Sequence, residues 1–200
     1  MILLDIEGTT TPIAFVTGTL VPYARAHLVP FLEREGRAGE APGLLAEMDR
    51  DSKSTALKEV QGRIWEQGYE RGELIAPVYP DVAPAFARWR SQGHALGIFS
   101  SGSVLAQQCL FRRTTAGDLT PHLQWYFDTN TGPKREPASY ASIAAIAGTP
   151  AAEILFISDA AAELDAARAA GMRTALADRP GNLPQPSHTH RIIHTFDELP

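Results

Sequence analysis

Short apolar runs of about four residues recur along the chain, and each ends in a polar or glycine-rich turn before a segment with helical periodicity. Because buried parallel strands are apolar on both faces and their crossover connections are helical, this alternation is typical of a parallel α/β sheet. The apolar runs predict strands at 2–4, 95–99, 125–127, 154–157 and 174–177, with a sixth candidate at 191–194. The helical segments between them are expected at 82–92, 103–112, 139–147 and 160–170.

A long gap interrupts this regular spacing. The first two predicted strands are separated by about 90 residues, whereas the later ones follow at intervals of about 20 to 30. Within the gap, 19–35 and 54–72 both have the periodicity of amphipathic helices. In the second segment, the apolar residues Leu57, Val60 and Ile64 fall on one helix face. The gap is therefore expected to hold a helical insertion.

A loop is expected inside this insertion, between its two helices. The stretch GRAGEAPG at 36–43 is rich in glycine and is expected to connect the two helices as a loop. We expect a Rossmann-like parallel α/β core made of residues 1–16 and 77–200. A small helical cap, residues 17–76, is predicted to be inserted into this core after the first strand.

Composition and charge narrow the class of protein. A chain of 200 residues that is 44% hydrophobic and 20% charged can form one buried core and a modest insertion. The net charge of −5 and the scattered Lys and Arg residues offer no basic surface, so nucleic acid is not an expected partner.

The apolar segments and the single cysteine bear on location. No apolar run approaches the roughly 20 residues needed to cross a bilayer, and Asp5 interrupts any signal-peptide core, so no membrane association is expected. Cys109 cannot form an internal disulfide, and its amphipathic surroundings favour a core position in a reducing cytoplasm. With no evident apolar stripe on the surface, we expect a cytoplasmic monomer.

Polar residues follow four of the predicted strands. In a parallel sheet, ligands gather at the carboxyl ends of the strands, so residues that follow different strands converge in space. These strand ends carry Asp5 and Glu7, then Ser100 and Ser101, then Asp128 with Lys134, and finally Asp159. The functional interpretation depends on the agreement of all four.

The carboxylates in this set suit a divalent metal site and phosphoryl chemistry. Asp5 and Asp159 are predicted to face each other across neighbouring strands, and their hard oxygens are the ligands that Mg²⁺ prefers. Glu7 is a third candidate ligand, through its side chain or its backbone. An ionised Asp5 can attack phosphorus, which divides hydrolysis into formation and breakdown of an aspartyl-phosphate. Glu7 can protonate the leaving oxygen and later deprotonate the attacking water.

The serine turn and the lysine suit a phosphate. Ser100 and Ser101 precede a predicted helix, whose free N–H groups and partial positive charge favour an anion. Lys134 supplies a full positive charge and reduces the repulsion between Asp5 and Asp159. The sequence therefore predicts Ser100, Ser101 and Lys134 as substrate-binding residues.

Each of these residues also has a structural interpretation. Asp5 could be a turn residue, Ser100–Ser103 could be a helix N-cap, and Lys134 could be a solvated lysine in a loop. Glu163, four residues after Asp159, could hydrogen-bond back to the loop or face solvent. The residues His188, His190 and His194 follow a proline-bearing loop rather than a strand end, which argues against a metal cluster.

Five segments resemble a known family. They are ILLDIEGTTTPIAFV, STALKEVQGRIWEQGY with RGEL following, FSSGSVLAQQCLF, FDTNTGPKREPASY and ILFISDAAAELDAA. The order of the acidic turn, the serine turn, the lysine and the Ser-Asp pair resembles the haloacid dehalogenase (HAD) superfamily of phosphohydrolases. The five segments together are similar to the enolase-phosphatases, or acireductone synthases, of methionine salvage, and they span about residues 1–180.

This resemblance implies a fold, a reaction and a cofactor. It implies the HAD fold and enolisation of 2,3-diketo-5-methylthiopentyl-1-phosphate, followed by hydrolysis to acireductone and phosphate, with one Mg²⁺ per subunit. Position by position, Asp5 matches the nucleophile and metal ligand, and Glu7 the second acidic residue of the first motif. Ser100 and Ser101 match the substrate-binding pair, Lys134 the phosphate-site lysine and Asp159 the remaining metal ligand.

Two other functions fit part of the same pattern. A generic HAD phosphatase would act on another small phosphate ester with the same residues. A receiver-like signalling domain also gathers acidic residues, Ser or Thr and Lys at strand ends. That domain, however, carries its phosphoacceptor after a middle strand and has no helical insertion, whereas the insertion here is large.

Overall fold

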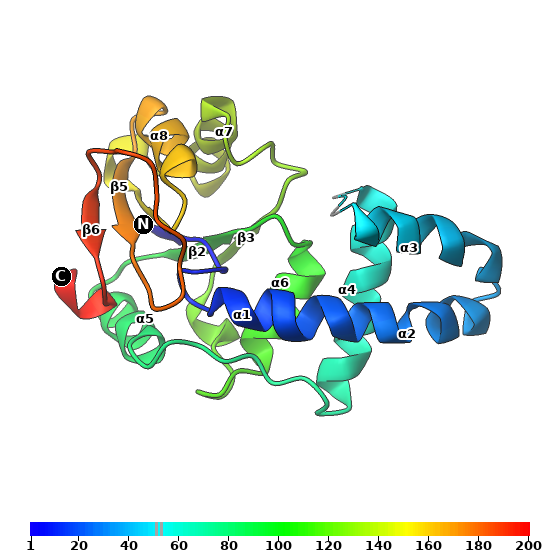
Figure 1. The fold of residues 1–200 in the computed structure, drawn as a ribbon. Helices are drawn as coiled ribbons and strands as arrows, with labels where there is room; N and C mark the ends of the chain where they lie inside the picture. Colours follow the sequence, from blue (N-terminus) through cyan, green and yellow to red (C-terminus); the bar gives the residue numbers. More distant parts are fainter. Residues whose placement is uncertain (51, 53) are drawn as a thin grey trace.

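A computed structural model describes residues 1–50, 52 and 54–200, and six parallel strands form its single sheet (Figure 1). The strand order is β3-β2-β1-β4-β5-β6. The strands are β1 Ile2–Leu4, β2 Leu96–Phe99, β3 Trp125–Phe127, β4 Leu155–Ser158, β5 Arg173–Ala177 and β6 Arg191–Ile193. All six predicted strands are therefore confirmed, with ends shifted by at most one residue.

The central strand β1 pairs with β2 on one side and β4 on the other. Leu4 lies level with Ile98 of β2 and Ile157 of β4, so the residues after these positions end at the same edge. Strand order reverses direction at β1, and in open parallel sheets such a point is where ligands bind. The register therefore brings the polar strand ends together.

Helices cover both faces of the sheet. They are α5 Val82–Ser91, α6 Val104–Arg112, α7 Pro137–Ala147 and α8 Ala161–Ala169, with short 3₁₀ turns at η3 Thr120–His122, η4 Ala151–Glu153 and η5 Phe196–Glu198. Alternate residues of β1 enter different clusters: Leu4 packs with the side chains of α5 and α6, and Leu3 with those of α7 and α8. Cys109 is buried in the first cluster, which confirms its predicted core position.

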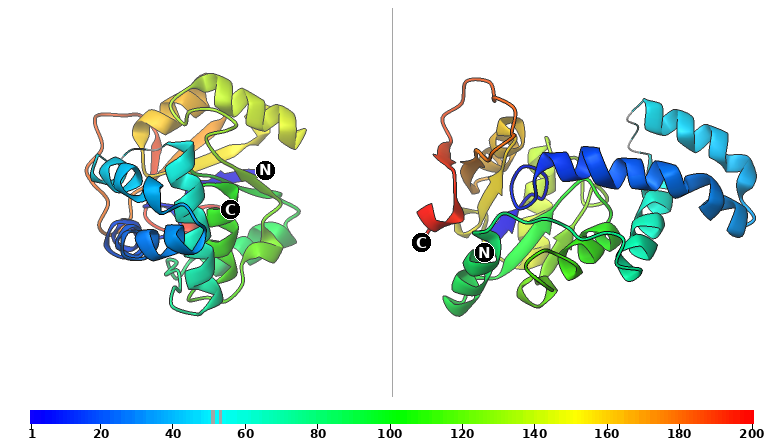
Figure 2. Two further views of the ribbon diagram at one scale, coloured as in Figure 1. Left: turned by 90° about the vertical axis from the view of Figure 1, so that its right-hand side faces the viewer. Right: turned by 60° about the horizontal axis from the view of Figure 1, so that its bottom comes forward.

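A helical cap extends from one end of the sheet, as Figures 1 and 2 show. Its elements are α1 Ile13–Phe15, the π-helical turn η1 Val16–Leu20, α2 Val21–Arg34, η2 Ala38–Glu40, α3 Ala41–Asp49 and α4 Thr55–Glu70. These helices bury a cluster of their own, which includes Leu28 and Phe31 of α2 and Val60 of α4. The predicted fold class, a parallel α/β sheet with an inserted helical cap, is confirmed. None of the helices in the described residues is long and apolar enough to cross a bilayer.

The prediction of a loop at 36–43 is partly wrong. Residues 38–40 form a 3₁₀ turn, and α3 begins at Ala41 and includes Gly43. Pro42 lies in the first turn of α3, where its fixed φ favours a helix start. Burial of Ala41 and Leu44 against α2 and α4 stabilises the helix despite the unfavourable glycine. Packing, which composition does not reveal, therefore outweighs local propensity.

The cap cluster can be tested at two adjacent residues of α2. Leu28 is fully buried and Val29 is 38% exposed. We expect Leu28→Ala to lower the free energy of unfolding by about 2 to 5 kcal/mol, because it leaves a cavity between the cap helices. Val29→Ala should change it by less than about 0.5 kcal/mol. Urea denaturation measures both values, and equal costs would contradict a packed cap core.

Candidate active site

Asp5 lies directly after β1 and is only 5% exposed. One carboxylate oxygen, Oδ1, accepts a hydrogen bond from the backbone N–H of Ile6 at 2.8 Å and contacts Lys134 Nζ at 2.8 Å. The other, Oδ2, accepts a hydrogen bond from the hydroxyl of Ser158 at 3.3 Å. The carboxylate is thus fixed in one orientation at the point where β1 and β4 end.

Lys134 reaches this carboxylate from the loop after β3 and contacts a second one. Its Nζ lies 2.7 Å from Oε2 of Glu163, which also accepts a hydrogen bond from Ser158 at 3.0 Å. Burial alone would lower the pKa of Lys134, but the carboxylates of Asp5 and Glu163 together hold that pKa above its ordinary value. Lys134 is therefore a buried ammonium shared by two acids.

The position of Lys134 depends on the loop that follows β3. Asp128 caps the start of this loop by accepting hydrogen bonds from the backbone and side-chain N–H groups of Asn130. Tyr140 of α7 donates from its hydroxyl to the carbonyl of Lys134 at 2.7 Å. From the cap, Lys58 of α4 donates to the hydroxyl of Thr129 at 2.7 Å. The loop is therefore held by both the core and the cap.

Asp159 lies at the end of β4, in the same acidic region. Burial raises its pKa to about 7, and the negative charges of Asp5, Glu163 and Glu7 add to this effect. The ammonium of Lys134 opposes this effect without cancelling it, so negative charge is in excess around Asp159. Such a surplus of negative charge in a buried site favours a bound cation.

The donors here fit a magnesium ion held by two carboxylates. Among the described residues, no group of three or more His, Cys, Asp or Glu side chains is arranged to hold a metal. Asp5 and Asp159 can supply two carboxylate oxygens, and a cation beside them would complete its shell with a backbone carbonyl and water, as Mg²⁺ commonly does. Glu7, which forms an isolated β-bridge with Thr11, offers such a carbonyl in the turn after β1.

The serine turn after β2 opens α6. Ser103 is the N-cap of α6, because its hydroxyl accepts a hydrogen bond from the N–H of Ala106 at 3.3 Å. The hydroxyl of Ser100 accepts one from Gly102 N at 3.3 Å. The capping interpretation therefore holds for Ser103, while Ser100 and Ser101 line a cavity.

This cavity lies between the cap and the sheet and encloses about 990 Å³, including space open to solvent. Its polar wall includes Glu7, Ser100 and Ser101. Its apolar wall comes mostly from the cap and includes Val16, Leu20, Val21, Met48, Leu57 and Trp65. A ligand with a polar head and an apolar tail would therefore be matched at both ends.

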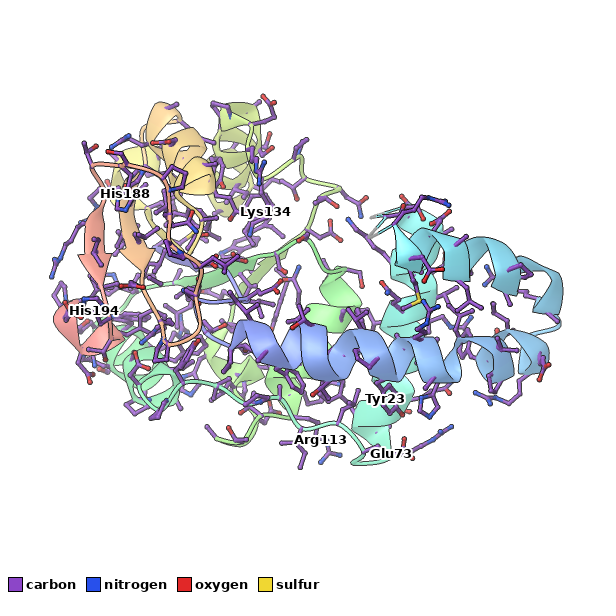
Figure 3. All side chains as sticks on the ribbon, in the orientation of Figure 1. Tyr23, Glu73, Arg113, Lys134, His188 and His194 are labelled. Atoms are coloured by element: carbon purple, nitrogen blue, oxygen red, sulfur yellow. The ribbon has the colours of Figure 1, made fainter. Side chains whose placement is uncertain are left out.

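The structure also shows which candidates lie elsewhere. Figure 3 shows His188 and His194 beside β6, away from Lys134. His190 has a structural part: its Nδ1 lies 2.8 Å from the hydroxyl of Thr174 and its Nε2 lies 3.0 Å from Asp165 Oδ1. His188, however, lines a pocket that Asp159 also lines, so a position after a proline-bearing loop does not by itself separate a histidine from the acidic strand ends.

Sequence reasoning missed one member of the site and left another undecided. Ser158, which bridges Asp5 and Glu163, was not singled out, although it immediately precedes Asp159. For Glu163, the interpretation in which it turns back to the loop is correct. Its place in the first turn of α8, four residues after Asp159, was the available signal.

A buried aspartate paired with lysine at the switch point of a parallel sheet, beside a serine turn and under a helical cap, defines a phosphohydrolase-type site. Comparison with known proteins agrees with this class. The family model for haloacid dehalogenase-like hydrolases matches residues 1–171. The chain belongs to this family and, within it, to the enolase-phosphatases.

The assignment to the enolase-phosphatases follows from similarity over nearly the whole chain. Enolase-phosphatase E1 of Synechococcus elongatus is 48% identical and is aligned over 99% of this chain and 96% of its own length. Enolase-phosphatase E1 of Sorangium cellulosum is 47% identical with the same coverage. Among solved structures, the UTR4 protein of Saccharomyces cerevisiae has a TM-score of 0.87 and 36% identity, and covers 100% of this chain and 99% of its own.

The raised pKa of Asp159 predicts a pH dependence of stability without metal. The folded state holds a proton up to about pH 7, whereas the unfolded chain releases it near the ordinary value of 3.8. The folded state therefore binds more protons between these values, so the free energy of unfolding falls as pH rises from about 4 to about 7.

Urea denaturation in the presence of a chelator measures this slope. We expect Asp159→Asn to flatten it, because an amide does not titrate. The control is Asp49→Asn, since Asp49 in α3 is exposed and pairs with Arg25 at the surface. Identical slopes in the wild type and Asp159→Asn would contradict the assignment.

Proposed function

We propose that this enzyme enolises 2,3-diketo-5-methylthiopentyl-1-phosphate and hydrolyses the enol phosphate to acireductone and inorganic phosphate. The observation that carries the proposal is the contact of Lys134 with Asp5, whose next two residues, Ile6 and Glu7, line a cavity with an apolar wall from the cap. Family membership supports a phosphatase, and the polar and apolar walls of the cavity fit the phosphate and the methylthio tail.

In this proposal, Asp5 is the nucleophile. Its Oδ2 attacks phosphorus in line with the leaving oxygen, and an aspartyl-phosphate forms. Lys134, with its raised pKa, stays protonated and balances the charge of the phosphate oxygens. The hydroxyls of Ser100 and Ser101, together with the start of α6, bind the remaining oxygens. Water then releases phosphate and regenerates the carboxylate.

Glu7 is proposed as the acid-base residue. It lines the cavity and lies two residues after Asp5. As a carboxylate it removes the proton next to the carbonyl in the enolisation. Glu7 then gives that proton to the enolate oxygen, which completes the enol. After taking up a proton from solvent, Glu7 protonates the oxygen that leaves phosphorus, and as a carboxylate it then deprotonates the attacking water.

The proposed cofactor is one Mg²⁺ per subunit, held by the carboxylates of Asp5 and Asp159 and by the backbone carbonyl of Glu7. When bound, Mg²⁺ would polarise the substrate oxygens as a Lewis acid and neutralise negative charge on the phosphate oxygens. This donor set agrees with the crowding of acids that raises the pKa of Asp159.

Three further features complete the proposal. We assign residues 17–76 to the cap and residues 1–16 and 77–200 to the core, since the separate cluster around Leu28 gives the cap its own interior. The cap would close over the tail and exclude water during enolisation. A cytoplasmic monomer agrees with the buried, unpaired thiol of Cys109, whose burial raises its pKa to about 11.

The reaction can be followed directly. With Mg²⁺ and the diketone phosphate, the wild type is expected to produce an enol absorbance and then release phosphate. Asp5→Asn removes the nucleophile, so phosphate release should fall by at least about 10³-fold while the enol accumulates. Phosphate release from simple monoesters without any enol would contradict the proposal and favour a generic phosphatase.

The apolar wall predicts substrate selectivity. Trp65 lines the cavity from α4, and its indole N–H donates to the carbonyl of Leu20 at 2.7 Å. We expect Trp65→Ala to lower kcat/KM for the diketone phosphate by about tenfold or more, because tail contacts are lost. An analogue whose tail is shortened to a methyl group should be affected by less than about threefold.

Steady-state kinetics on both substrates give this comparison. The control is Trp125→Ala, because Trp125 lies on β3 outside the lining of the cavity. Equal losses on the two substrates for Trp65→Ala would show that the indole does not contact the tail.

A further inference from the structure

The turn after Asp5 is held by two segments that are distant in sequence, around Tyr79 and at residues 179–182. The carbonyl of Gly8 accepts a hydrogen bond from Asn182 Nδ2 at 2.9 Å, and the carbonyl of Thr9 accepts one from Arg179 Nε at 3.2 Å. The carbonyl of Thr10 accepts one from the backbone N–H of Tyr79 at 3.1 Å. Three successive carbonyls, of residues 8–10, are therefore fixed by contacts with distant segments. We call this turn, residues 6–11, the catalytic turn.

Asn182 also faces the acidic site. Its Nδ2 donates to the carbonyls of both Gly8 and Ala177, at 2.9 and 3.0 Å, which fixes the orientation of the amide. Its Oδ1 is buried and has no hydrogen-bond partner among the described residues. A Cβ on Gly8 would lie 2.9 Å from this oxygen and 2.5 Å from Oδ2 of Asp159. The amide oxygen and the carboxylate thus crowd around the same backbone atom.

The position of Asn182 is set by a tight turn. Asn182 N donates to the carbonyl of Arg179 at 3.0 Å across Pro180 and Gly181, and Gly181 has φ +91°. Proline followed by glycine with positive φ is the signature of a type II turn. The sequence Arg-Pro-Gly-Asn therefore encodes a rigid placement of the two side chains at its ends.

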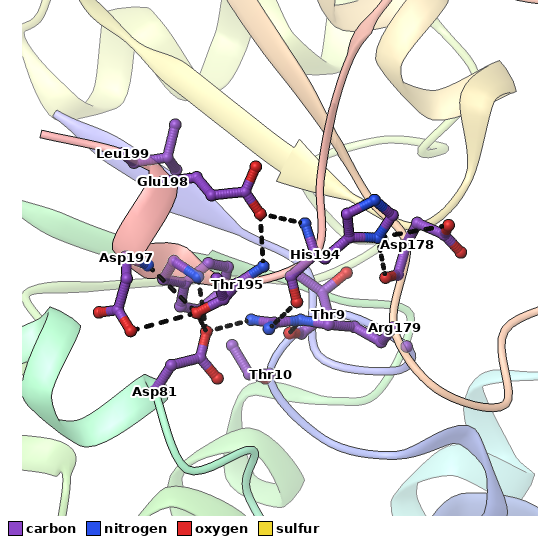
Figure 4. A network of polar contacts seen from close by, with 12 residues as sticks. Thr9, Thr10, Asp81, Asp178, Arg179, His194, Thr195, Asp197, Glu198 and Leu199 are labelled. Carbon is purple, nitrogen blue, oxygen red and sulfur yellow. Dashed lines mark hydrogen bonds and ion pairs between the residues drawn. The ribbon is translucent and has the colours of Figure 1, made fainter.

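Arg179 anchors this turn in the core, as Figure 4 shows. The residue is 4% exposed, and its guanidinium lies between the rings of Tyr79 and Phe196, 4.8 and 4.4 Å from their centroids. It pairs with Asp81 at 2.8 Å and donates to the carbonyl of His194 at 2.7 Å. The anchor is buried, charged and stacked, so the turn has little freedom to move.

We propose that Asn182 is a positioning residue for the metal-dependent reaction. Its Nδ2 fixes the carbonyl of Gly8, and its Oδ1 is directed to the side of Asp159 that faces the catalytic turn. Asn182 Oδ1 and Asp159 Oδ2 are both acceptors and both lie within 2.9 Å of the place that a Cβ on Gly8 would take. A donor between them, such as a water held by the metal, would satisfy both. Asn182 thus orients Asp159 without being a ligand itself. This inference rests on the proposed function only for the use of Mg²⁺.

The proposal predicts a loss of metal affinity when the amide is removed. Asn182→Leu has nearly the same size but can neither hold Gly8 nor accept beside Asp159. We expect its Mg²⁺ dissociation constant, measured by isothermal titration calorimetry, to rise by about 10- to 100-fold, the usual effect of losing a partner behind a metal ligand. Amide hydrogen exchange at residues 8–11 should accelerate by at least about tenfold.

A second variant and a control make the test decisive. Asn182→Asp keeps the shape but loses the N–H donors, so exchange at residues 8–11 should accelerate even if Asn182→Leu fails to fold. Arg168→Gln is the control: it detaches the same loop at Thr189, where the hydrogen bond is 2.7 Å, and touches nothing in the catalytic turn. Its Mg²⁺ affinity and its exchange at residues 8–11 should equal those of the wild type.

The outcomes separate this inference from the proposed substrate. Unchanged Mg²⁺ affinity in a folded Asn182→Leu, or unchanged exchange at residues 8–11 in Asn182→Asp, would overturn the positioning role. Equal effects in Arg168→Gln would also overturn it, because the loop and not the amide would then be responsible. Neither readout uses the diketone phosphate, so a failure of the proposed reaction would appear separately, as wild-type enzyme that binds Mg²⁺ but releases no phosphate from that substrate.

Discussion

The structure of the site depends on one buried ammonium. Lys134 stands between Asp5 and Glu163, at 2.8 and 2.7 Å, in a region that also holds Asp159. Without this positive charge, the buried carboxylates would repel one another across the ends of β1 and β4, and some would have to take up protons. The loop that delivers Lys134 is for this reason held firmly, by Asp128 at its start and by Tyr140 behind it.

Much of this arrangement could be predicted from the sequence. The apolar runs located every strand, and the parallel register then brought Asp5, Lys134 and Asp159 to one edge, because strand ends meet wherever the sheet is in register. Two features of the site could not be predicted from the strand ends. The direction of Glu163 depends on where α8 begins, and Asn182 lies in a loop without periodicity, so its partners appear only in three dimensions.

The helical cap illustrates a different limit of sequence analysis. Its long helices were predicted because their apolar faces are regular, whereas the first three residues of α3 fell within the stretch 36–43, which was predicted as a loop because it is rich in glycine. Its formation depends on burial against α2 and α4, a contribution that exceeds the local preference. For the site, the consequence is that the wall around Met48 consists of ordered helix rather than irregular loop.

The separation of the two interiors has an evolutionary consequence. Since Leu28 and its neighbours form a cluster apart from the sheet, residues around that cluster can be exchanged or inserted without displacing Asp5 from Lys134. Lys58 is an exception in the cap, because it contacts Thr129 in the loop that carries Lys134. A single insertion in β1 or β4, by contrast, would break the level register that aligns the reacting groups. Substrate preference can therefore diverge in this scaffold through changes of cap length and lining, while the chemistry at the sheet edge is inherited intact.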